Sequence, residues 1–173
     1  MLFCDFDGTL APIVERPEMA MMSGKLKSLI QSLAQQPRFT ISIVSGRSLS
    51  DLRKRVGIKE LIYAGNHGME IEGPGIRFVE RSAMKARPTL RLMHRLLTQA
   101  LGEVKGTMVE DKGLTLSIHY RQADEEDEER VKSIFNNVVD NARSLGEIRV
   151  TAGKKVLEVR PAVNWDKGRA LVF

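Results

Sequence analysis

The chain has 173 residues, of which 42% are hydrophobic and 28% are charged, a composition typical of a soluble globular protein. No apolar stretch is long enough to span a membrane and no signal-peptide pattern follows Met1, so we expect neither a membrane anchor nor export. The single cysteine, Cys4, excludes an intramolecular disulfide, and a cytoplasmic location is expected. The net charge of +5 favours anionic partners only weakly, and with few aromatic residues no nucleic-acid surface is expected.

The first residues, 1–4, form a short apolar run that predicts a strand buried on both faces of a parallel sheet. Asp5 and Asp7 follow where this strand ends, and their i, i+2 spacing directs both carboxylates to the same side of the sheet edge. Gly8 and Thr9 then break the strand into a loop. One carboxylate in such a place can attack an electrophile while the other transfers a proton. The alternative is a solvent-exposed Asp-rich turn without function.

Residues 23–64 alternate between helical and strand patterns. Apolar residues recur at helical spacing after Ser23, which we expect to cap the helix. The expected elements are a helix over 23–36, a strand over 39–44, a helix over 49–56 and a strand over 61–64. This alternation predicts a doubly wound, Rossmann-like α/β core with a parallel sheet. The polar segments 45–47 and 65–68 both follow strands, at the edge where such folds bind ligands.

From residue 82 the pattern changes to helix–strand–strand, repeated twice, which predicts an α+β lobe on an antiparallel sheet. A helix is expected from Asp166 onward. We therefore expect a core formed by residues 1–81 and 160–173, with a cap inserted over residues 82–159. The expected elements of the cap are a helix from about Pro88 to Leu101, strands over 107–110 and 114–121, a helix over 124–143, and strands over 148–151 and 156–159.

The segment from Asp5 to Ala11 resembles the signature of the haloacid-dehalogenase-like phosphatases, in which the first Asp becomes an aspartyl-phosphate. By this resemblance Asp5 attacks phosphorus, while Asp7 protonates the leaving alkoxide and then activates the water that releases phosphate. Ser45 would hydrogen-bond the phosphoryl oxygens and Lys167 would neutralise their charge. Asp5 and the backbone carbonyl of Asp7 would bind Mg²⁺, which prefers oxygen ligands. Taken singly, Ser45 is better explained as a helix cap and Lys167 as a surface lysine.

Further motifs narrow the resemblance to the trehalose-6-phosphate phosphatase family, over nearly the whole chain. These motifs are Ser45-Gly46-Arg47, Gly65-Asn66-His67-Gly68, His119-Tyr120-Arg121 and Leu157-Glu158-Val159-Arg160-Pro161. The resemblance implies that a sugar phosphate is bound from the core by Gly46, Arg47, Asn66 and His67, and from the cap by Glu110, Lys112, Arg121 and Glu158. Without the family context, His67 is equally explained as a loop histidine. Glu110 and Glu158 are then better explained as exposed strand carboxylates.

The expected function is the Mg²⁺-dependent hydrolysis of trehalose 6-phosphate to trehalose and phosphate. The family's fourth catalytic motif, an Asp-rich loop that completes the magnesium site, has no counterpart in these residues. We therefore expect a core that is incomplete at its C-terminus, weak metal affinity, and self-association through an uncovered sheet. The alternatives are a phosphatase for another sugar phosphate and a non-catalytic module that binds sugar phosphates.

Overall fold

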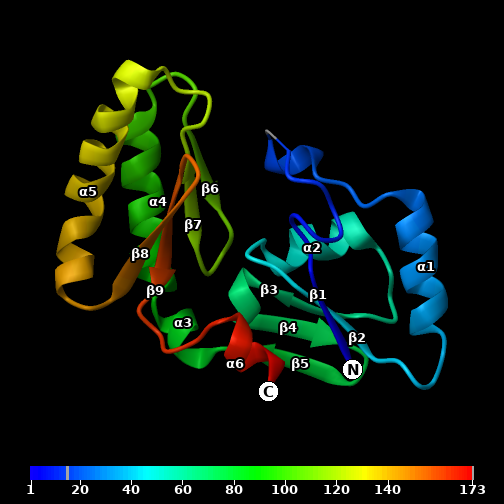
Figure 1. Ribbon diagram of the computed structural model, residues 1–173. Helices are drawn as coiled ribbons and strands as arrows, with labels where there is room; N and C mark the ends of the chain where they lie inside the picture. The colour runs from blue at the N-terminus through cyan, green and yellow to red at the C-terminus, as the bar shows by residue number, and fades with distance from the viewer. Residues whose placement is uncertain (15, 173) are drawn as a thin grey trace. The chain divides into compact units, whose positions relative to one another are not determined.

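The computed structural model describes residues 1–14 and 16–172, which form two compact units (Figure 1). Unit 1 comprises Met1–Glu80 and Trp165–Phe173, and unit 2 comprises Arg81–Asn164. Phe173, the last residue of the expected core, lies outside the described residues. None of the described helices is long and apolar enough to cross a membrane.

Unit 1 is built on a five-stranded sheet with the order β1-β2-β3-β4-β5 (Figure 1). The first three strands, β1 (Leu2–Asp5), β2 (Ile41–Val44) and β3 (Ile62–Gly65), are parallel. The last two, β4 (Glu70–Gly73) and β5 (Ile76–Val79), are antiparallel. The prediction of a parallel sheet is thus confirmed for β1 to β3 only. The β4–β5 hairpin was not predicted, because each strand has only four residues and is defined by its pairing rather than by a long apolar run.

Two helices cover one face of this sheet and a third covers the other. Helices α1 (Gly24–Ala34) and α2 (Leu49–Val56) share one apolar cluster with Phe6 and strands β2 and β3. The Ser23 hydroxyl accepts a hydrogen bond from the Leu26 amide at 3.3 Å, as the predicted cap requires. Helix α6 (Lys167–Leu171) packs on the opposite face, where Ala170 joins a smaller cluster. The helices expected over 23–36, over 49–56 and after Asp166 are confirmed.

Strand β1 is more exposed than the sequence indicates. Leu2 is 42% exposed and Phe3 is 36% exposed, so the prediction of a strand buried on both faces is wrong. The reason is its place in the sheet: β1 is the outer strand, and in the described part of the chain only β2 pairs with it.

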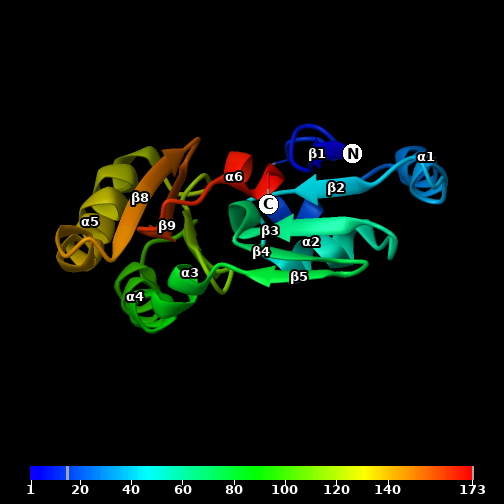
Figure 2. The same ribbon diagram turned by 90° about the horizontal axis from the view of Figure 1, so that it is seen from below.

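Unit 2 is a four-stranded antiparallel sheet, β6-β7-β9-β8, with two long helices on one face (Figure 2). The helices and the inward-facing strand residues enclose one apolar core that includes Leu97, Phe135 and Val159. Helix–strand–strand occurs twice, so the predicted α+β lobe is confirmed. Strand β9 runs on to Pro161, which pairs with Ile148. The elements of unit 2 are α3 (Arg81–Lys85), α4 (Arg87–Leu101), β6 (Met108–Asp111), β7 (Leu116–His119), α5 (Glu128–Ser144), β8 (Ile148–Gly153) and β9 (Val156–Pro161).

Candidate active site

The polar segments of unit 1 meet at one edge of its sheet because the first three strands are parallel and in register. Asp5, the last residue of β1, is paired with Val44, and Val44 is paired with Ala64. The residues that follow this row, starting with Phe6, Ser45 and Gly65, therefore emerge side by side. This is the carboxyl edge of the strands, where open α/β sheets bind ligands.

The Asp5 carboxylate is held by two hydrogen bonds. Its Oδ1 accepts one from the Phe6 amide at 3.0 Å and one from Lys167 Nζ at 2.8 Å. Both side chains remain partly exposed, so the ion pair is accessible to a ligand. A carboxylate beside an ammonium group can act as a nucleophile toward an anionic phosphoryl group, because the cation lowers the charge repulsion.

The Asp7 carboxylate is bound by Arg47 in a bidentate arrangement. Arg47 Nη2 donates to Asp7 Oδ1 at 2.7 Å, and Nε donates to Oδ2 at 3.0 Å. The Ser45 hydroxyl lies 3.4 Å from Asp7 Oδ2 and accepts a hydrogen bond from the Arg47 amide at 3.1 Å. The buried Arg47 guanidinium also lies 5.3 Å from the centre of the Phe6 ring. Asp7 thus sits in a fixed orientation at the same sheet edge as Asp5.

Asp51, on α2, completes the charge network around Arg47 and had no role in the sequence interpretation. Its Oδ2 accepts from Arg47 Nη1 at 2.8 Å and from Arg55 Nε at 2.7 Å. Burial opposes the charge of Asp51, but the hydrogen bonds from Arg55 and Arg47 outweigh it, so the pKa of this carboxyl lies below its ordinary value. Burial likewise opposes the charge of Arg47, and its bonds to Asp7 and Asp51 raise the pKa of the guanidinium. The signal in the sequence was the i, i+4 spacing of Arg47 and Asp51.

Lys167 reaches Asp5 because α6 packs tightly against the segment after β3. A Cβ added at Gly68 would lie only 2.2 Å from the Cβ of Ala170, and the φ of Gly68 is +87°. Both features require glycine at this position. The Asp166 side chain caps α6 by accepting a hydrogen bond from the Arg169 amide at 2.9 Å. Gly68 and this cap together fix the place of Lys167.

Asn66 and His67 occupy an unusual backbone conformation, with φ values of +49° and +58°. The Asn66 side chain is buried, and its Nδ2 donates to Glu70 Oε2 at 2.6 Å. A Cβ at Gly46 would approach the His67 ring to 2.8 Å, so glycine lets the ring lie against this loop. Left-handed backbone at non-glycine residues costs free energy and is concentrated at functional sites.

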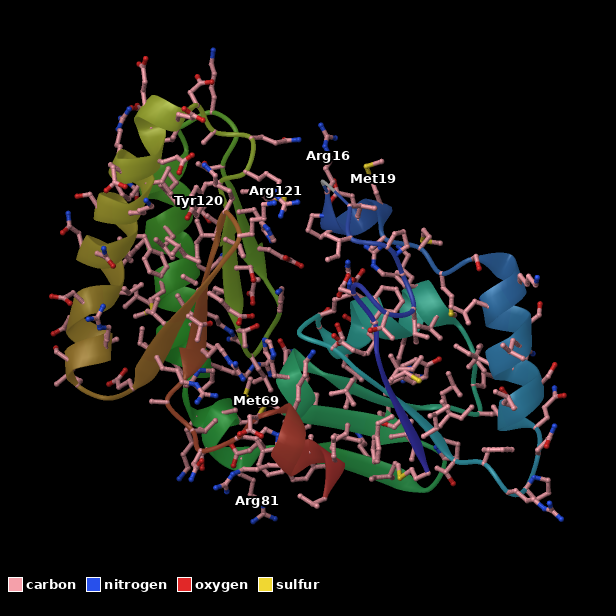
Figure 3. The ribbon with its side chains drawn as sticks, in the orientation of Figure 1. Arg16, Met19, Met69, Arg81, Tyr120 and Arg121 are labelled. Carbon is pink, nitrogen blue, oxygen red and sulfur yellow. The ribbon has the colours of Figure 1, made fainter. Side chains whose placement is uncertain are left out.

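In unit 2, three predicted site residues form one cluster on the face of the sheet away from the helices. Lys112 Nζ lies 3.8 Å from Glu158 Oε1 and 4.0 Å from Glu110 Oε2. A histidine that the sequence interpretation left without a role, His119, places Nε2 2.9 Å from Glu110 Oε2. Arg121 lies beyond the end of β7, is exposed, and donates to the Lys154 carbonyl at 3.3 Å. Figure 3 labels Arg121 beside Tyr120, which belongs to the core of unit 2.

The two oxygens that the sequence analysis assigns to a hard cation are the Asp5 carboxylate and the backbone carbonyl of Asp7. Such ligands match Mg²⁺, which takes few protein ligands and keeps several waters. Among the described residues, no three or more His, Cys, Asp or Glu side chains are grouped so as to hold a metal ion. The residues present therefore fit part of a magnesium site.

Comparison with known proteins gives the family. The sequence model of the family described as trehalose-phosphatase matches residues 3–173. The chain belongs to this family. Among its relatives, the probable trehalose-phosphate phosphatase 9 of Oryza sativa subsp. japonica is 39% identical over 186 residues, covering 100% of this chain and 48% of the relative. The trehalose-phosphate phosphatase of Mycobacterium bovis is 39% identical over 173 residues, covering 99% and 43%. The chain thus spans about half the length of these family members.

Solved structures agree with the family and give the haloacid-dehalogenase-like fold. A trehalose-6-phosphate phosphatase related protein matches with a TM-score of 0.85 at 24% identity, covering 98% of this chain and 71% of that one, and this likeness concerns the fold alone. The C-terminal domain of the Candida albicans trehalose-6-phosphate phosphatase matches with a TM-score of 0.78 at 28% identity, covering 97% and 58%. Both units of the chain therefore follow folds seen within the family.

Proposed function

We propose that this protein is a Mg²⁺-dependent phosphatase that converts trehalose 6-phosphate to trehalose and phosphate. The observation that carries the proposal is the arrangement at the sheet edge of unit 1. There Asp5 meets Lys167 at 2.8 Å, and Asp7 is oriented by Arg47 and Ser45. The names of the family and of the relatives support the choice of substrate.

In this proposal Asp5 attacks phosphorus and forms an aspartyl-phosphate as the bond to the sugar oxygen breaks. Asp7 gives its proton to the departing alkoxide and is left ionised. Asp7 then takes a proton from the water that attacks the aspartyl-phosphate, which regenerates Asp5 and releases phosphate. The bidentate contact from Arg47 holds the Asp7 carboxyl group in one orientation for both proton transfers.

Ser45 and Lys167 bind the phosphoryl group in this proposal. The Ser45 hydroxyl donates a hydrogen bond to its oxygens, and Lys167, already close to Asp5, neutralises their charge. The Asp5 carboxylate and the Asp7 carbonyl would bind Mg²⁺, which supplies further positive charge for the same purpose.

We further propose that unit 1 is the doubly wound core and that unit 2 is its cap. Helices on both faces of the three parallel strands support the first assignment. The second assignment is supported by Glu110, Glu158 and Lys112, which lie on the face of the unit 2 sheet away from its helices, called the open face below. Carboxylates and ammonium groups form hydrogen bonds with sugar hydroxyls. Specificity for the sugar would then be determined by the unit 2 residues Glu110, Lys112, Arg121 and Glu158. From the core, the site would be lined by Gly46, Asn66 and His67.

A panel of phosphate esters tests the proposal. Phosphate release is measured with Mg²⁺ on trehalose 6-phosphate, glucose 6-phosphate and p-nitrophenyl phosphate, for the wild-type chain and for Asp5→Asn. We expect trehalose 6-phosphate to have the highest kcat/KM, and Asp5→Asn to bind it without turnover. Preference for another sugar phosphate would contradict the substrate. Binding without turnover by the wild-type chain would favour the module that only binds sugar phosphates.

A further inference from the structure

The open face of the unit 2 sheet carries a row of polar side chains from all four strands. Strand register places Glu110 of β6 opposite Ser117 of β7, Ser117 opposite Glu158 of β9, and Glu158 opposite Thr151 of β8. Neighbouring residues in the same strands, such as Leu116 and Val159, point into the core. The row therefore lies on the side of the sheet away from the helices.

His119 lies on the same face, two residues after Ser117, and is the diagonal neighbour of Glu110 across the β6–β7 pair. Its Nε2 is 2.9 Å from Glu110 Oε2, within hydrogen-bond distance. Lys112 Nζ, at 4.0 Å from the same oxygen, is beyond hydrogen-bond distance of it and attracts it by its charge. The two groups therefore act on Glu110 differently: Lys112 attracts the carboxylate, whereas His119 fixes its direction.

Direction matters for a carboxylate that recognises a hydroxyl group. A glutamate side chain has several rotatable bonds, and holding it in one rotamer costs free energy that reduces ligand affinity. A hydrogen bond from a group on the neighbouring strand holds the rotamer before the ligand arrives. The carboxylate retains acceptor positions for hydroxyl groups, since each of its oxygens has two lone pairs.

We propose that His119 is a positioning residue for sugar recognition, which orients Glu110 toward the hydroxyls of the substrate. This assignment rests on the proposed function, because it takes the open face of unit 2 as the surface that binds the sugar. His119 touches the carboxylate and not the reacting atoms, so it affects the affinity for the sugar and not the chemistry at phosphorus. A histidine that only stabilised the β6–β7 pair would instead affect folding and would be indifferent to the ligand.

The test compares two ligands on the full chain. Trehalose 6-phosphate carries the sugar, whereas inorganic phosphate carries only the group that unit 1 would bind. Dissociation constants are measured by calorimetry without Mg²⁺, so that no turnover occurs, for the wild type, His119→Ala and His119→Gln. The variant His94→Ala, which removes a partly exposed histidine of α4, is the matched control. Melting temperatures are recorded for all four chains.

We expect His119→Ala to weaken the binding of trehalose 6-phosphate by about tenfold, the loss typical of one hydrogen bond to a charged group. Inorganic phosphate should bind unchanged. His119→Gln, whose amide can donate from nearly the position of Nε2, should recover most of the affinity, and His94→Ala should match the wild type.

Two results would overturn the assignment. The first is that His119→Ala binds trehalose 6-phosphate as tightly as the wild type does. The second is that His119→Ala and His119→Gln both bind the two ligands more weakly to the same degree and melt at a lower temperature. Failure of the proposed function looks different. A wild-type chain that binds trehalose 6-phosphate no more tightly than inorganic phosphate would refute the substrate, and this assignment with it.

Discussion

Replacing Asp51 with Asn should destabilise unit 1, because Asp51 joins two arginines that hold the segment after the first motif. Its carboxylate accepts hydrogen bonds from Arg47 and Arg55. Arg47 in turn donates to the Pro17 carbonyl at 2.8 Å, and Arg55 donates to the Glu18 carbonyl at 2.8 Å. The substitution Asp51→Asn removes the charge at the centre of this network while it keeps the size of the side chain.

The magnitude follows from the two contacts and the exposure of Asp51. Hydrogen bonds to charged groups contribute about 1.5–3 kcal/mol each when buried. The side chain of Asp51 is 29% exposed, which screens the charge. Because both bonds end on one oxygen, the Asn oxygen can still accept them, but as weaker bonds to a neutral group. We therefore expect the free energy of unfolding at neutral pH to fall by about 1–2 kcal/mol.

The assay is urea unfolding at several pH values, with Asp140→Asn on the exposed side of α5 as the control. The pKa of Asp51 is lower in the folded chain than its ordinary value of about 3.9 in the unfolded chain. Its stabilisation is therefore complete above that value and disappears as the pH falls through the folded pKa. The difference between wild type and Asp51→Asn should be largest near neutrality and shrink below about pH 4. A difference of zero at neutral pH, or one that does not change with pH, would refute the reasoning.

Four further substitutions test other parts of the account. Asp7→Asn should slow the hydrolysis of trehalose 6-phosphate more than that of p-nitrophenyl phosphate, because the nitrophenolate leaving group needs no proton. Equal losses in the rate of phosphate release from the two esters would contradict the acid role of Asp7. Glu158→Ala should lower kcat/KM for trehalose 6-phosphate by about tenfold and leave the aryl ester unchanged. Gly68→Ala should displace α6 and Lys167, so that phosphate affinity measured by calorimetry falls; an unchanged affinity would mean that α6 adjusts. Phe3→Lys, at the exposed β1 edge, should reduce any self-association seen by light scattering.

The long helices and the motif positions could be predicted from the sequence, because they depend on local pattern. The apolar repeat in α4 and α5 spans several turns, and a buried stripe of that length is hard to mistake. Asp5, Ser45 and Lys167 were assigned together because each follows an apolar segment in the order that the family resemblance implies. The exposure of β1 was not predictable in this way, because an apolar strand has the same sequence at the edge of a sheet and at its centre.

The two residues missed at the site were missed for different physical reasons. The i, i+4 pair of Arg47 and Asp51 is visible in the sequence, but such pairs are common on exposed helices, and only burial makes this one important. The contact between Glu110 and His119 depends on the register of β6 against β7. A shift of one residue in that register would place the two side chains on opposite faces, and the sequence does not state the register.

The measurement that tests the central claim most directly is chemical trapping of phosphate on Asp5. The Asp7→Asn chain is mixed with p-nitrophenyl phosphate and Mg²⁺, quenched in acid, digested and examined by mass spectrometry, with Asp5→Asn as the control. Since Asp7→Asn slows the attack of water on the intermediate, the account predicts a phosphoryl group on the peptide that contains residue 5, absent in Asp5→Asn. Release of nitrophenol without any label on that peptide, or a label on another residue, would contradict it.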